Sequence, residues 1–535
     1  MRMSFFFCNF ARKIDLSRIT MKYPVGVQNF EVLRKEGFVY VDKTDLIYEL
    51  AQQHICFLCR PRRFGKSLTI STLEAYFQGK KELFKGLKIS SLEKKWQKHP
   101  VFHIDFNGIN FQETDALVNR LNDTITIWEN QYGFTPTSVN IGDRFAYLLE
   151  RTHQQFGERC VVLIDEYDKP LLDVMGEVQE QTNRDTLKAF YSVFKLADAH
   201  LQFVLLTGVT KFSQVSVFSG FNQPLDISMH PKYESICGIT EQELFYYFDA
   251  PISEVALQND MSIEEMKSLL KRHYDGYHFS PSMTDIYNPF SLLNVFASSL
   301  VSDYWFSSGT PTYLIKLLKN NNVDVSSLLS RPYEAAYFID YRANVADPLA
   351  MLYQSGYLTI KSVVRQESDA NQYYLDFPNV EVKRGFISML SNSYFTTQED
   401  SNSIVSQIVR CLEKHQLDDL HLLLDCYFSS IDYEMRKDKE YHFQYTLYLI
   451  FSLMSTYNVT IERHNSQGRA DMIVETKQHI YIFEFKLDGT AEEALQQIED
   501  RQYAKPYLTD SRPLTKIGVS FGSKSGTIDE WMVCE

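Results

Sequence analysis

The chain has 535 residues, more than a single hydrophobic core can hold, so we expect roughly three or four domains. Hydrophobic residues make up 44% of the chain, and 33 Tyr and 38 Phe are typical of a protein that folds around aromatic cores. The formal net charge of −14 argues against a surface that coats nucleic acid everywhere, although it leaves room for a local basic groove.

The first twenty residues differ from the rest of the chain. Ser4–Cys8 is a short apolar run that is soon followed by charged residues, and it lacks the core and the cleavage site of a signal peptide. A more regular pattern begins at Met21, so we expect residues 1–20 either to be an extension without regular structure or to precede the true start. No apolar run approaches the roughly 20 residues needed to span a bilayer, so we expect no membrane partner.

Eight cysteines are scattered along the chain, and only Cys56 and Cys59 have C-x-x-C spacing. That spacing can indicate a zinc or redox site, but no second pair and no nearby histidine completes one. Both residues lie in an apolar, strand-like run, Ile55–Cys59. We therefore favour buried thiols, which fit the reducing cytoplasm, and we expect a cytoplasmic protein.

The most informative stretch, Arg60–Ser67, follows that run and precedes a helical pattern that extends to about Gln78. A strand, a tight loop, Gly-Lys-Ser and a helix together hold a nucleoside triphosphate. Backbone N–H groups at the helix N-terminus face the phosphates, Lys66 reaches the β and γ oxygens, and the Ser67 hydroxyl ligates Mg²⁺. Arg60 stands where the general pattern has a glycine, so the motif alone could arise by chance. The nucleotide-binding residues expected from this loop are Arg63, Phe64, Gly65, Lys66 and Ser67.

A second element, Val161–Glu166, lies about a hundred residues further along. A buried strand that ends in Asp-Glu supplies one acid for the Mg²⁺ shell and another to orient the attacking water. On its own, this run could be a core strand with an ordinary acidic end. Together and in this order, the two elements predict a site for ATP and Mg²⁺, with Asp165 as a metal ligand and Glu166 as the catalytic residue that orients the attacking water.

The first third of the chain alternates between strand and helix patterns, which predicts a parallel sheet covered by helices. The expected strands are Ile55–Cys59, Val101–Phe106, Cys160–Asp165, Phe203–Thr207 and Ser235–Gly238. The strand Phe203–Thr207 ends in a polar residue. In NTPases with an extra strand between the two motifs, the residue at that position commonly senses the γ-phosphate. Thr207 is our candidate, ahead of Lys211 and Ser213, although a threonine can also simply end a strand.

The middle of the chain has a different pattern. Thr240 and Glu243 form a capping box that starts a helix, and residues 240–300 look helical around an insertion at Tyr274–Phe290. Later helices are followed by two strand-like runs, an order that suits a winged-helix-like module, and then by more helical sequence. These segments are the runs Gly356–Val364 and Gln372–Phe377, a break at Pro378-Asn379, and helical sequence up to Ser430.

A second set of polar residues lies near the end of the chain. Its elements are an apolar helix at His442–Tyr457 preceded by Glu440, a strand at Gly468–Val474, and a strand at His479–Phe485. The period of two along a strand puts Glu484 and Lys486 on one face, and a hairpin can bring Asp471 alongside them. A helix from Glu492 follows and carries Gln497.

Two carboxylates and a lysine at one point have a specific use. The acids, Asp471 and Glu484, can hold one or two Mg²⁺ or Mn²⁺ ions that polarise a phosphodiester, and Lys486 can position or activate the water. The alternative is a solvated strand face with an ion pair, because this spacing is common on surface strands. The apolar strand around the motif and the helix with Gln497 favour a nuclease site.

With these motifs in place, the chain resembles the AAA-ATPase-like family of bacterial proteins that end in a PD-(D/E)XK nuclease domain. The matching residues run along nearly the whole chain from Met21 onward. Besides the C-terminal motif, they are Phe38–Thr44, Arg60–Ser67, Leu163–Asp168, Thr207–Lys211, Tyr274–Tyr277, Tyr287–Phe290, Leu352–Leu358 and Pro378-Asn379. Within that family, an arginine at position 60 is ordinary.

The resemblance implies an α/β chain with a P-loop NTPase sheet, a helical and winged-helix-like middle region and a restriction-endonuclease-like C-terminal domain. We expect the boundaries at 21–239, 240–378, 379–430 as a helical connector, and 431–535. Residue by residue, the resemblance assigns Lys66 and Ser67 to phosphates and Mg²⁺, Asp165 to the metal shell and Glu166 to the water. In the last domain it assigns Asp471, Glu484 and Lys486 to catalysis, with Glu440 and Gln497 as supporting residues.

Two further roles stay open at this stage. Residues 40–44 could approach the nucleotide or could simply pack. Arg62 and Arg63 could contact phosphate, could act across a subunit boundary, or could only add positive charge to the loop.

We therefore expect an ATP-binding and ATP-hydrolysing protein coupled to a Mg²⁺-dependent nuclease that acts on nucleic acid, with DNA favoured. The rival hypothesis is a nucleotide switch whose C-terminal fold is inactive and serves for docking or nucleic-acid binding. The acidic net charge favours this rival modestly. A metabolic kinase is a weaker interpretation, because no small-molecule acceptor motif is evident. DNA versus RNA, the biological role and assembly into a homo-oligomer are left open by the sequence.

Overall fold

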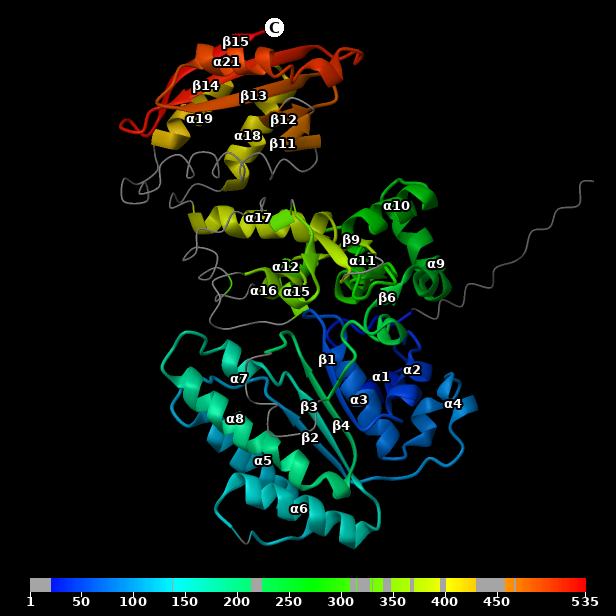
Figure 1. Ribbon diagram of the computed structural model, residues 1–535. Helices are drawn as coiled ribbons and strands as arrows, with labels where there is room; N and C mark the ends of the chain where they lie inside the picture. Colours follow the sequence, from blue (N-terminus) through cyan, green and yellow to red (C-terminus); the bar gives the residue numbers. More distant parts are fainter. Residues whose placement is uncertain are drawn as a thin grey trace, which may run out of the picture.

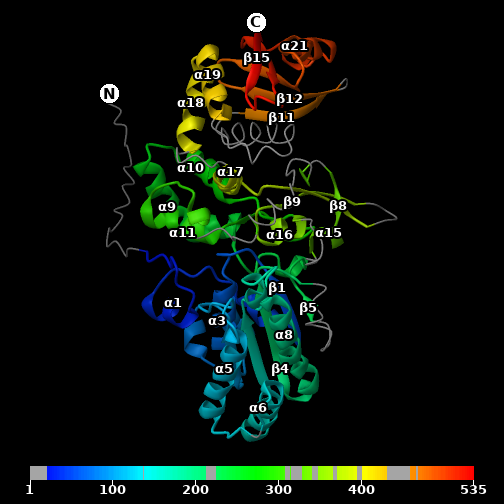
Figure 2. The same cartoon turned by 90° about the vertical axis from the view of Figure 1, so that its left-hand side faces the viewer.

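The computed structural model describes residues 21–136, 138–212, 224–307, 314, 328–329, 331–339, 348–365, 370–394, 401–429, 458–465 and 468–535. Figures 1 and 2 show an N-terminal α/β core, a middle region of helices and short strands, and a C-terminal α/β unit at the far end. The expected extension 1–20, Ser213, Glu440 and the helix expected over His442–Tyr457 lie outside the described residues.

The N-terminal core is built on a five-stranded parallel sheet with the order β2-β3-β4-β1-β5. Its strands are β1 (Ile55–Cys59), β2 (Val101–Asp105), β3 (Cys160–Asp165), β4 (Leu201–Gly208) and β5 (Leu225–Asp226). Every residue of β1 and β3 is buried, as continuous apolar runs between helices require. The predicted parallel sheet is confirmed, and β4 lies between the phosphate-loop strand and the acidic strand.

One strand of the prediction is wrong. Residues 235–238 form no strand, and the fifth place in the sheet belongs to β5, which pairs with β1. Gly238 has a φ of 90° and donates its N–H to the carbonyl of Phe64, so this segment is bonded to the phosphate loop instead of to a sheet neighbour. Strand β6 (Ile239–Thr240) follows and pairs with β7 (Ile286–Tyr287).

Helices surround the core sheet. They are α1 (Phe30–Glu36), α2 (Thr44–Leu50), α3 (Lys66–Phe77), α4 (Ile89–Leu92), α5 (Ala116–Tyr132), α6 (Ile141–Phe156), α7 (Lys169–Leu172) and α8 (Gln179–Leu196), with short 3₁₀ turns at Lys81–Phe84, Asp198–His200 and Pro231–Tyr233. Helices α5, α6 and α8 pack on one another, and the ring of Phe145 stacks on Phe190 with 5.0 Å between centroids. These aromatic contacts fix the layer that supports the sheet.

The middle region combines helices with a three-stranded sheet. Its elements are α9 (Glu241–Gln258), α10 (Ile263–Tyr274), α11 (Pro289–Ser298), α12 (Tyr304–Ser307), β8 (Tyr333–Glu334), α15 (Ala336–Ile339), α16 (Leu349–Gln354), β9 (Thr359–Val364), β10 (Gln372–Asp376) and α17 (Val380–Tyr394). Both hydrogen bonds of the expected capping box at Thr240 and Glu243 are present. The sheet order is β8-β10-β9, and β9 pairs antiparallel with β10. The winged-helix assignment stays a prediction.

The C-terminal unit is a second α/β fold. Its elements are α18 (Ser401–Glu413), α19 (Leu417–Ser429), β11 (Asn458–Asn465), β12 (Gly468–Glu475), β13 (Ile480–Leu487), α21 (Ala491–Asp500), a 3₁₀ turn at Lys505–Tyr507, β14 (Leu514–Phe521) and β15 (Ile528–Cys534). The five strands lie in chain order, and only β13 and β14 run parallel. Helix α21 packs against both of these strands.

Helices α18 and α19 belong to this unit by their packing. Leu412, Leu420 and Phe428 share one buried cluster with Tyr481 and Val519 of the sheet. The sequence placed residues 379–430 in a connector, because amphipathic helices alone do not show which core they join. We therefore propose to draw the boundary of the C-terminal unit before α18. Within the residues that the structure describes, no helix is both long and apolar enough to cross a bilayer.

Candidate functional site

A cavity of about 550 Å³ opens where the phosphate loop meets α3. Gly65, with a φ of 101°, immediately precedes α3, and this left-handed conformation is open to glycine without strain. Helix α3 then begins at Lys66, so that the Ser67 side chain and the free N–H groups of the first turn lie at the cavity. Arg63 and Phe64 line it as well. The structure thus brings together the loop residues expected at a nucleotide.

Lys66 and Glu166 meet inside the cavity. The Lys66 side chain is only 4% exposed, and its ammonium donates to the carbonyls of Arg60 at 3.1 Å and Pro61 at 3.3 Å. It also lies 3.6 Å from Oε1 of Glu166. Glu166 has a φ of 53°, a left-handed conformation at the end of β3 that is uncommon away from glycine. The two residues predicted to bind phosphate and to orient water are therefore neighbours.

Asp165 and Thr207 lie deeper than Glu166. The Thr207 hydroxyl donates to Oδ1 of Asp165 at 2.6 Å, and the same oxygen accepts the N–H of Glu166 at 3.1 Å. Both side chains are buried, and neither is part of the cavity wall. This contact agrees with β4 lying beside β3, while the roles of Asp165 in the metal shell and of Thr207 as a γ-phosphate sensor stay predictions.

The unusual residue of the loop, Arg60, does not line this cavity. Its side chain is 1% exposed, and its guanidinium donates to the carbonyls of Ser228 at 2.7 Å and Tyr233 at 3.1 Å. The guanidinium also lies 4.3 Å from the ring centroid of Phe279. Arg60 therefore anchors the start of the loop to the segment after β5, and its departure from the glycine consensus serves packing.

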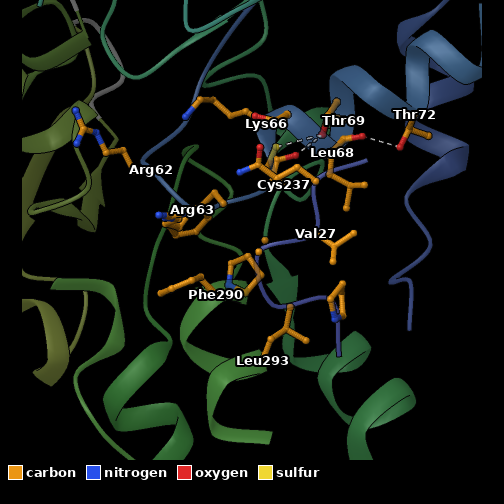
Figure 3. Close-up of a pocket in the computed structure, with 18 of the residues that line it drawn as sticks. Val27, Arg62, Arg63, Lys66, Leu68, Thr69, Thr72, Cys237, Phe290 and Leu293 are labelled. Atoms are coloured by element: carbon orange, nitrogen blue, oxygen red, sulfur yellow. Dashed lines mark hydrogen bonds between the residues drawn. The ribbon is translucent and has the colours of Figure 1, made fainter. Parts of the chain in front are cut away.

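Beyond the first turn of α3, the cavity continues between walls from distant parts of the chain. Figure 3 shows Lys66 and Thr69 on one side and Val27, Phe290 and Leu293 across from them. A nucleotide whose phosphates bind the first-turn N–H groups would place its nucleoside in this further space. The remaining wall residues from the N-terminal segment and the loop before α2 are Pro24, Val25, Gly26, Gln28, Val39, Tyr40, Val41 and Lys43.

Lys43 joins the core to the middle region at the edge of this cavity. Its ammonium lies 2.5 Å from Oε2 of Glu243, and that oxygen also accepts the N–H of Thr240 at 2.9 Å in the capping box of α9. Burial lowers the pKa of Lys43 from its usual value. Of the expected stretch 40–44, Tyr40, Val41 and Lys43 thus reach the cavity, and Lys43 also ties α9 to the core.

Several residues of the cavity have no signal in the sequence. Asp105, Asn107, Lys169 and Asp173 line it together with Glu166. Asp105 accepts hydrogen bonds from the backbone and the side-chain amide of Asn107, at 2.8 and 2.9 Å. Only the position of Asp105 at the end of a predicted parallel strand pointed to this edge of the sheet. The walls near Phe290 fall in the Tyr287–Phe290 motif, which matched the family without suggesting a role.

The second site lies on the C-terminal sheet, where β12 and β13 pair. Oδ2 of Asp471 accepts the N–H of Phe485 at 2.9 Å, and Oε2 of Glu484 accepts the N–H of Asp471 at 3.3 Å. The Lys486 ammonium lies 3.9 Å from Oε1 of Glu484. The amide of Gln497, from α21, bridges the pair by donating to Glu484 and accepting from Lys486. The structure therefore gathers four of the five predicted residues.

Glu484 is the buried member of this cluster. Its side chain is 1% exposed, and burial, together with the negative charge of Asp471, raises its pKa to about 8. Asp471 and Glu484 suit Mg²⁺ or Mn²⁺, which bind well to one or two carboxylates plus water. Among the described residues, no group of three or more acids, histidines or cysteines is placed to hold a metal, and Glu440 lies outside that part of the chain.

The fold and the two sites define a P-loop NTPase core joined to a nuclease-type α/β unit. Residues 24–218 match the family described as "Predicted AAA-ATPase", and residues 438–531 match the PD-(D/E)XK nuclease superfamily. A protein of Azotobacter chroococcum mcd 1, described as "Uncharacterized protein in vnfD 5'region", is 34% identical over 522 residues, which cover 96% of this chain and 98% of that protein. The chain belongs to the AAA-ATPase-like family whose members end in a PD-(D/E)XK nuclease superfamily domain.

A solved structure is also similar to the chain. The Aeropyrum pernix ORC2 protein, in its ADPNP-ADP complexes, is 12% identical, and the match covers 68% of this chain and 92% of that chain with a TM-score of 0.25. At that TM-score, the likeness supports no conclusion. The family assignment made from the motifs is confirmed by the sequence matches alone.

Proposed function

We propose that this protein binds and hydrolyses ATP at Lys66 and thereby controls a Mg²⁺- or Mn²⁺-dependent nuclease site at Asp471, Glu484 and Lys486. The nucleic acid that we expect as substrate is DNA. The observation that carries this proposal is the convergence of two carboxylates, a lysine and a glutamine on β12, β13 and α21, in a chain that also has a phosphate-loop cavity.

In the nucleotide cavity, each residue has a distinct proposed role. The first-turn N–H groups of α3 would receive the phosphates, and the Lys66 ammonium would exchange the carbonyls of Arg60 and Pro61 for phosphate oxygens. Ser67 would ligate Mg²⁺, which neutralises negative charge on the phosphates when it is bound. Glu166, close to Lys66, would orient the attacking water.

In the carboxylate cluster, the proposed roles are metal binding, positioning of water and support of these residues. Asp471 and Glu484 would ligate the divalent ion, which polarises the phosphodiester when it is bound. Glu484 must give up its proton to do so, because only the carboxylate is a metal ligand. Lys486 would position the attacking water, and Gln497 holds Lys486 and Glu484 in a fixed relation by its two amide hydrogen bonds.

Cleavage of circular and linear DNA with Mg²⁺ or Mn²⁺ tests the nuclease site. We expect Glu484→Gln to lose metal-dependent cleavage, because the amide cannot replace a carboxylate ligand, and Glu492→Gln, at an exposed position of α21, to keep it. Equal cleavage by wild type and Glu484→Gln would contradict the assignment.

The rival function is a nucleotide switch with an inactive C-terminal unit that docks onto a partner. The enclosed position of Glu484, whose carboxylate is already bonded to Asp471 and Gln497, favours it, as does the net charge of −14. Titration of Mn²⁺ by calorimetry separates the two functions. Binding that Asp471→Asn abolishes supports the nuclease, and absence of binding by the folded wild type supports the switch.

A further inference from the structure

The short helix α12 lies between the phosphate loop and helix α17. Trp305 contacts the phosphate loop and Phe306 contacts α17. These adjacent residues of α12 are more than two hundred positions from the loop in the sequence. Figure 1 shows α17 at the side of the middle region that faces the C-terminal unit. Helix α17 also contacts α18, which shares a core with the C-terminal sheet.

The first contact reaches the loop itself. The indole N–H of Trp305 donates to the carbonyl of Arg62 at 3.1 Å, and the Trp305 side chain is 6% exposed. The loop also packs closely against Gly356. A Cβ atom added to this glycine would lie only 2.6 Å from Cβ of Pro61. A hydrogen bond and a close backbone contact from the middle region therefore fix two consecutive residues of the loop.

The second contact reaches α17. The backbone N–H of Trp305 donates to Oε1 of Glu381 at 2.7 Å, and Glu381 lies fully buried in the first turn of α17. The Ser291 hydroxyl of α11 completes this network at 3.0 and 2.8 Å from the two carboxylate oxygens. A Cβ atom at Gly385 would lie 1.9 Å from the ring of Phe306, so that α17 packs directly on α12.

The part of the loop that Trp305 holds adjoins the two carbonyls that accept hydrogen bonds from Lys66. Lys66 donates to the carbonyls of Arg60 and Pro61, the two residues that precede Arg62. When a phosphate competes for the Lys66 ammonium, these carbonyls lose their donor and the adjoining peptide units can rotate. The carbonyl of Arg62 belongs to the next peptide unit, so its bond to Trp305 would register that change.

We propose that Trp305 is a positioning residue for the phosphate loop and that its two hydrogen bonds couple the loop to α17. The inference rests on the proposed ATP binding at Lys66 and adds the route by which the nucleotide acts on the C-terminal unit. Trp305→Phe keeps an aromatic ring and the backbone bond to Glu381 but removes the indole donor. It should weaken ATP binding about three- to tenfold, which is the effect of one hydrogen bond.

The decisive readout is amide hydrogen exchange in α17, with and without saturating ATP and Mg²⁺. We expect ATP to change the protection of residues 381–389 in the wild type, and we expect saturated Trp305→Phe to lose that change. Trp128→Phe is the matched control, because Trp128 is also buried but packs on Phe102 and Phe145 in the core. If replacing any buried tryptophan removed the ATP-dependent change in protection, both variants would lose it.

The outcomes distinguish failure of the coupling from failure of the proposed function. If the folded wild type binds no ATP, both fall together. If it binds ATP and α17 does not respond, or if saturated Trp305→Phe responds as fully as the wild type, the coupling is refuted while ATP binding stands. Glu381→Ala removes the acceptor of the Trp305 N–H and should lose the response, whereas Glu381→Gln keeps an acceptor and should retain it. This pair tests the coupling where Trp305→Phe folds poorly, and a full response in Glu381→Ala would refute it.

Discussion

The nucleotide cavity and the carboxylate cluster differ in how ready they are to receive a ligand. Lys66 and Ser67 lie on an open cavity of about 550 Å³ at the edge of a parallel sheet, on a loop and the start of a helix. Glu484 lies within a strand, and its oxygens are bonded to Gln497 and to the backbone of Asp471. The first site has an open cavity, whereas the second would have to exchange internal hydrogen bonds and a proton in order to bind a metal.

This difference suggests which site controls the other. A site on loops can respond to a ligand by local rotation, because loop backbone is less constrained than a sheet. A site inside a sheet changes only when its neighbours move or when a strong ligand displaces them. We therefore expect ATP to act first and the carboxylate cluster to respond.

Lys66→Ala should have the largest effect, and it should affect only one of the two sites. Removing the ammonium from the loop should weaken ATP binding at least about 100-fold, since charge-assisted bonds to phosphate are lost. Calorimetry with ATP measures this, and Mn²⁺ binding at the C-terminal unit should be unchanged. Lys85→Ala, at an exposed position, is the control. ATP affinity within threefold of the wild type would rule out Lys66 as a phosphate ligand.

Gly356→Ala tests the contact between the middle region and the phosphate loop. The new methyl group would meet Pro61 at 2.6 Å, and the φ of 86° is itself unfavourable for alanine, so the free energy of unfolding should fall by about 3 kcal/mol. Gly86→Ala isolates the backbone term, because Gly86 has a φ of 81° with no atom within 4 Å, and it should lower that free energy by about 1 kcal/mol. If chemical denaturation gave the same loss of unfolding free energy for Gly356→Ala and Gly86→Ala, the close approach of residue 356 to Pro61 would have no effect on stability.

Glu381→Gln tests the buried carboxyl that joins α12 to α17. Burial raises the pKa of Glu381 from 4.5 to about 7. The native state therefore holds this proton more tightly than the unfolded state does, so the contribution to stability is complete below about pH 4.5, falls as the pH rises and is lost above about pH 7. The amide introduced by Glu381→Gln would stay neutral throughout this range.

The difference in unfolding free energy between Glu381→Gln and the wild type should accordingly grow in favour of the variant by about 2 kcal/mol between pH 5 and pH 7.5. Denaturation at several pH values measures it. A constant difference across this range would mean that Glu381 ionises normally in the folded protein.

Thr207→Val should have the smallest effect, and it tests whether Thr207 acts in ATP binding or in the chemical step. The variant keeps the shape but removes the hydroxyl that donates to Asp165 at 2.6 Å. We expect kcat for ATP hydrolysis to fall about tenfold, equivalent to about 1.4 kcal/mol, with little change in KM. Steady-state phosphate release measures both constants. A raised KM with an unchanged kcat would assign Thr207 to binding instead of to the chemical step.

The elements that could be predicted from the sequence are those with local signals. Ile55–Cys59 and Cys160–Asp165 have the predicted bounds, because continuous apolar runs flanked by polar turns define buried parallel strands. The capping box at Thr240 is equally local. The cluster of Asp471, Glu484 and Lys486 followed from the two-residue period of strands and from one hairpin.

The features that were missed depend on contacts between distant segments. The fifth strand is only Leu225–Asp226, too short for a periodic signal, whereas the predicted segment 235–238 is held by the bond from Gly238 to the carbonyl of Phe64 in the phosphate loop. Phe290 and Trp305 reach the nucleotide site through tertiary packing, which no local pattern encodes. In the same way, the sequence of α18 and α19 shows that they are amphipathic but not which core they join.

If ATP at Lys66 controls the cluster at Glu484, the rate of DNA cleavage should depend on ATP only when Lys66 is present. The rate of Mn²⁺-dependent cleavage of circular DNA is compared with and without ATP for the wild type and for Lys66→Ala. We expect ATP to change the cleavage rate of the wild type and to leave the rate of Lys66→Ala unchanged. An equal wild-type rate under both conditions, or an ATP effect that persists in Lys66→Ala, would contradict it.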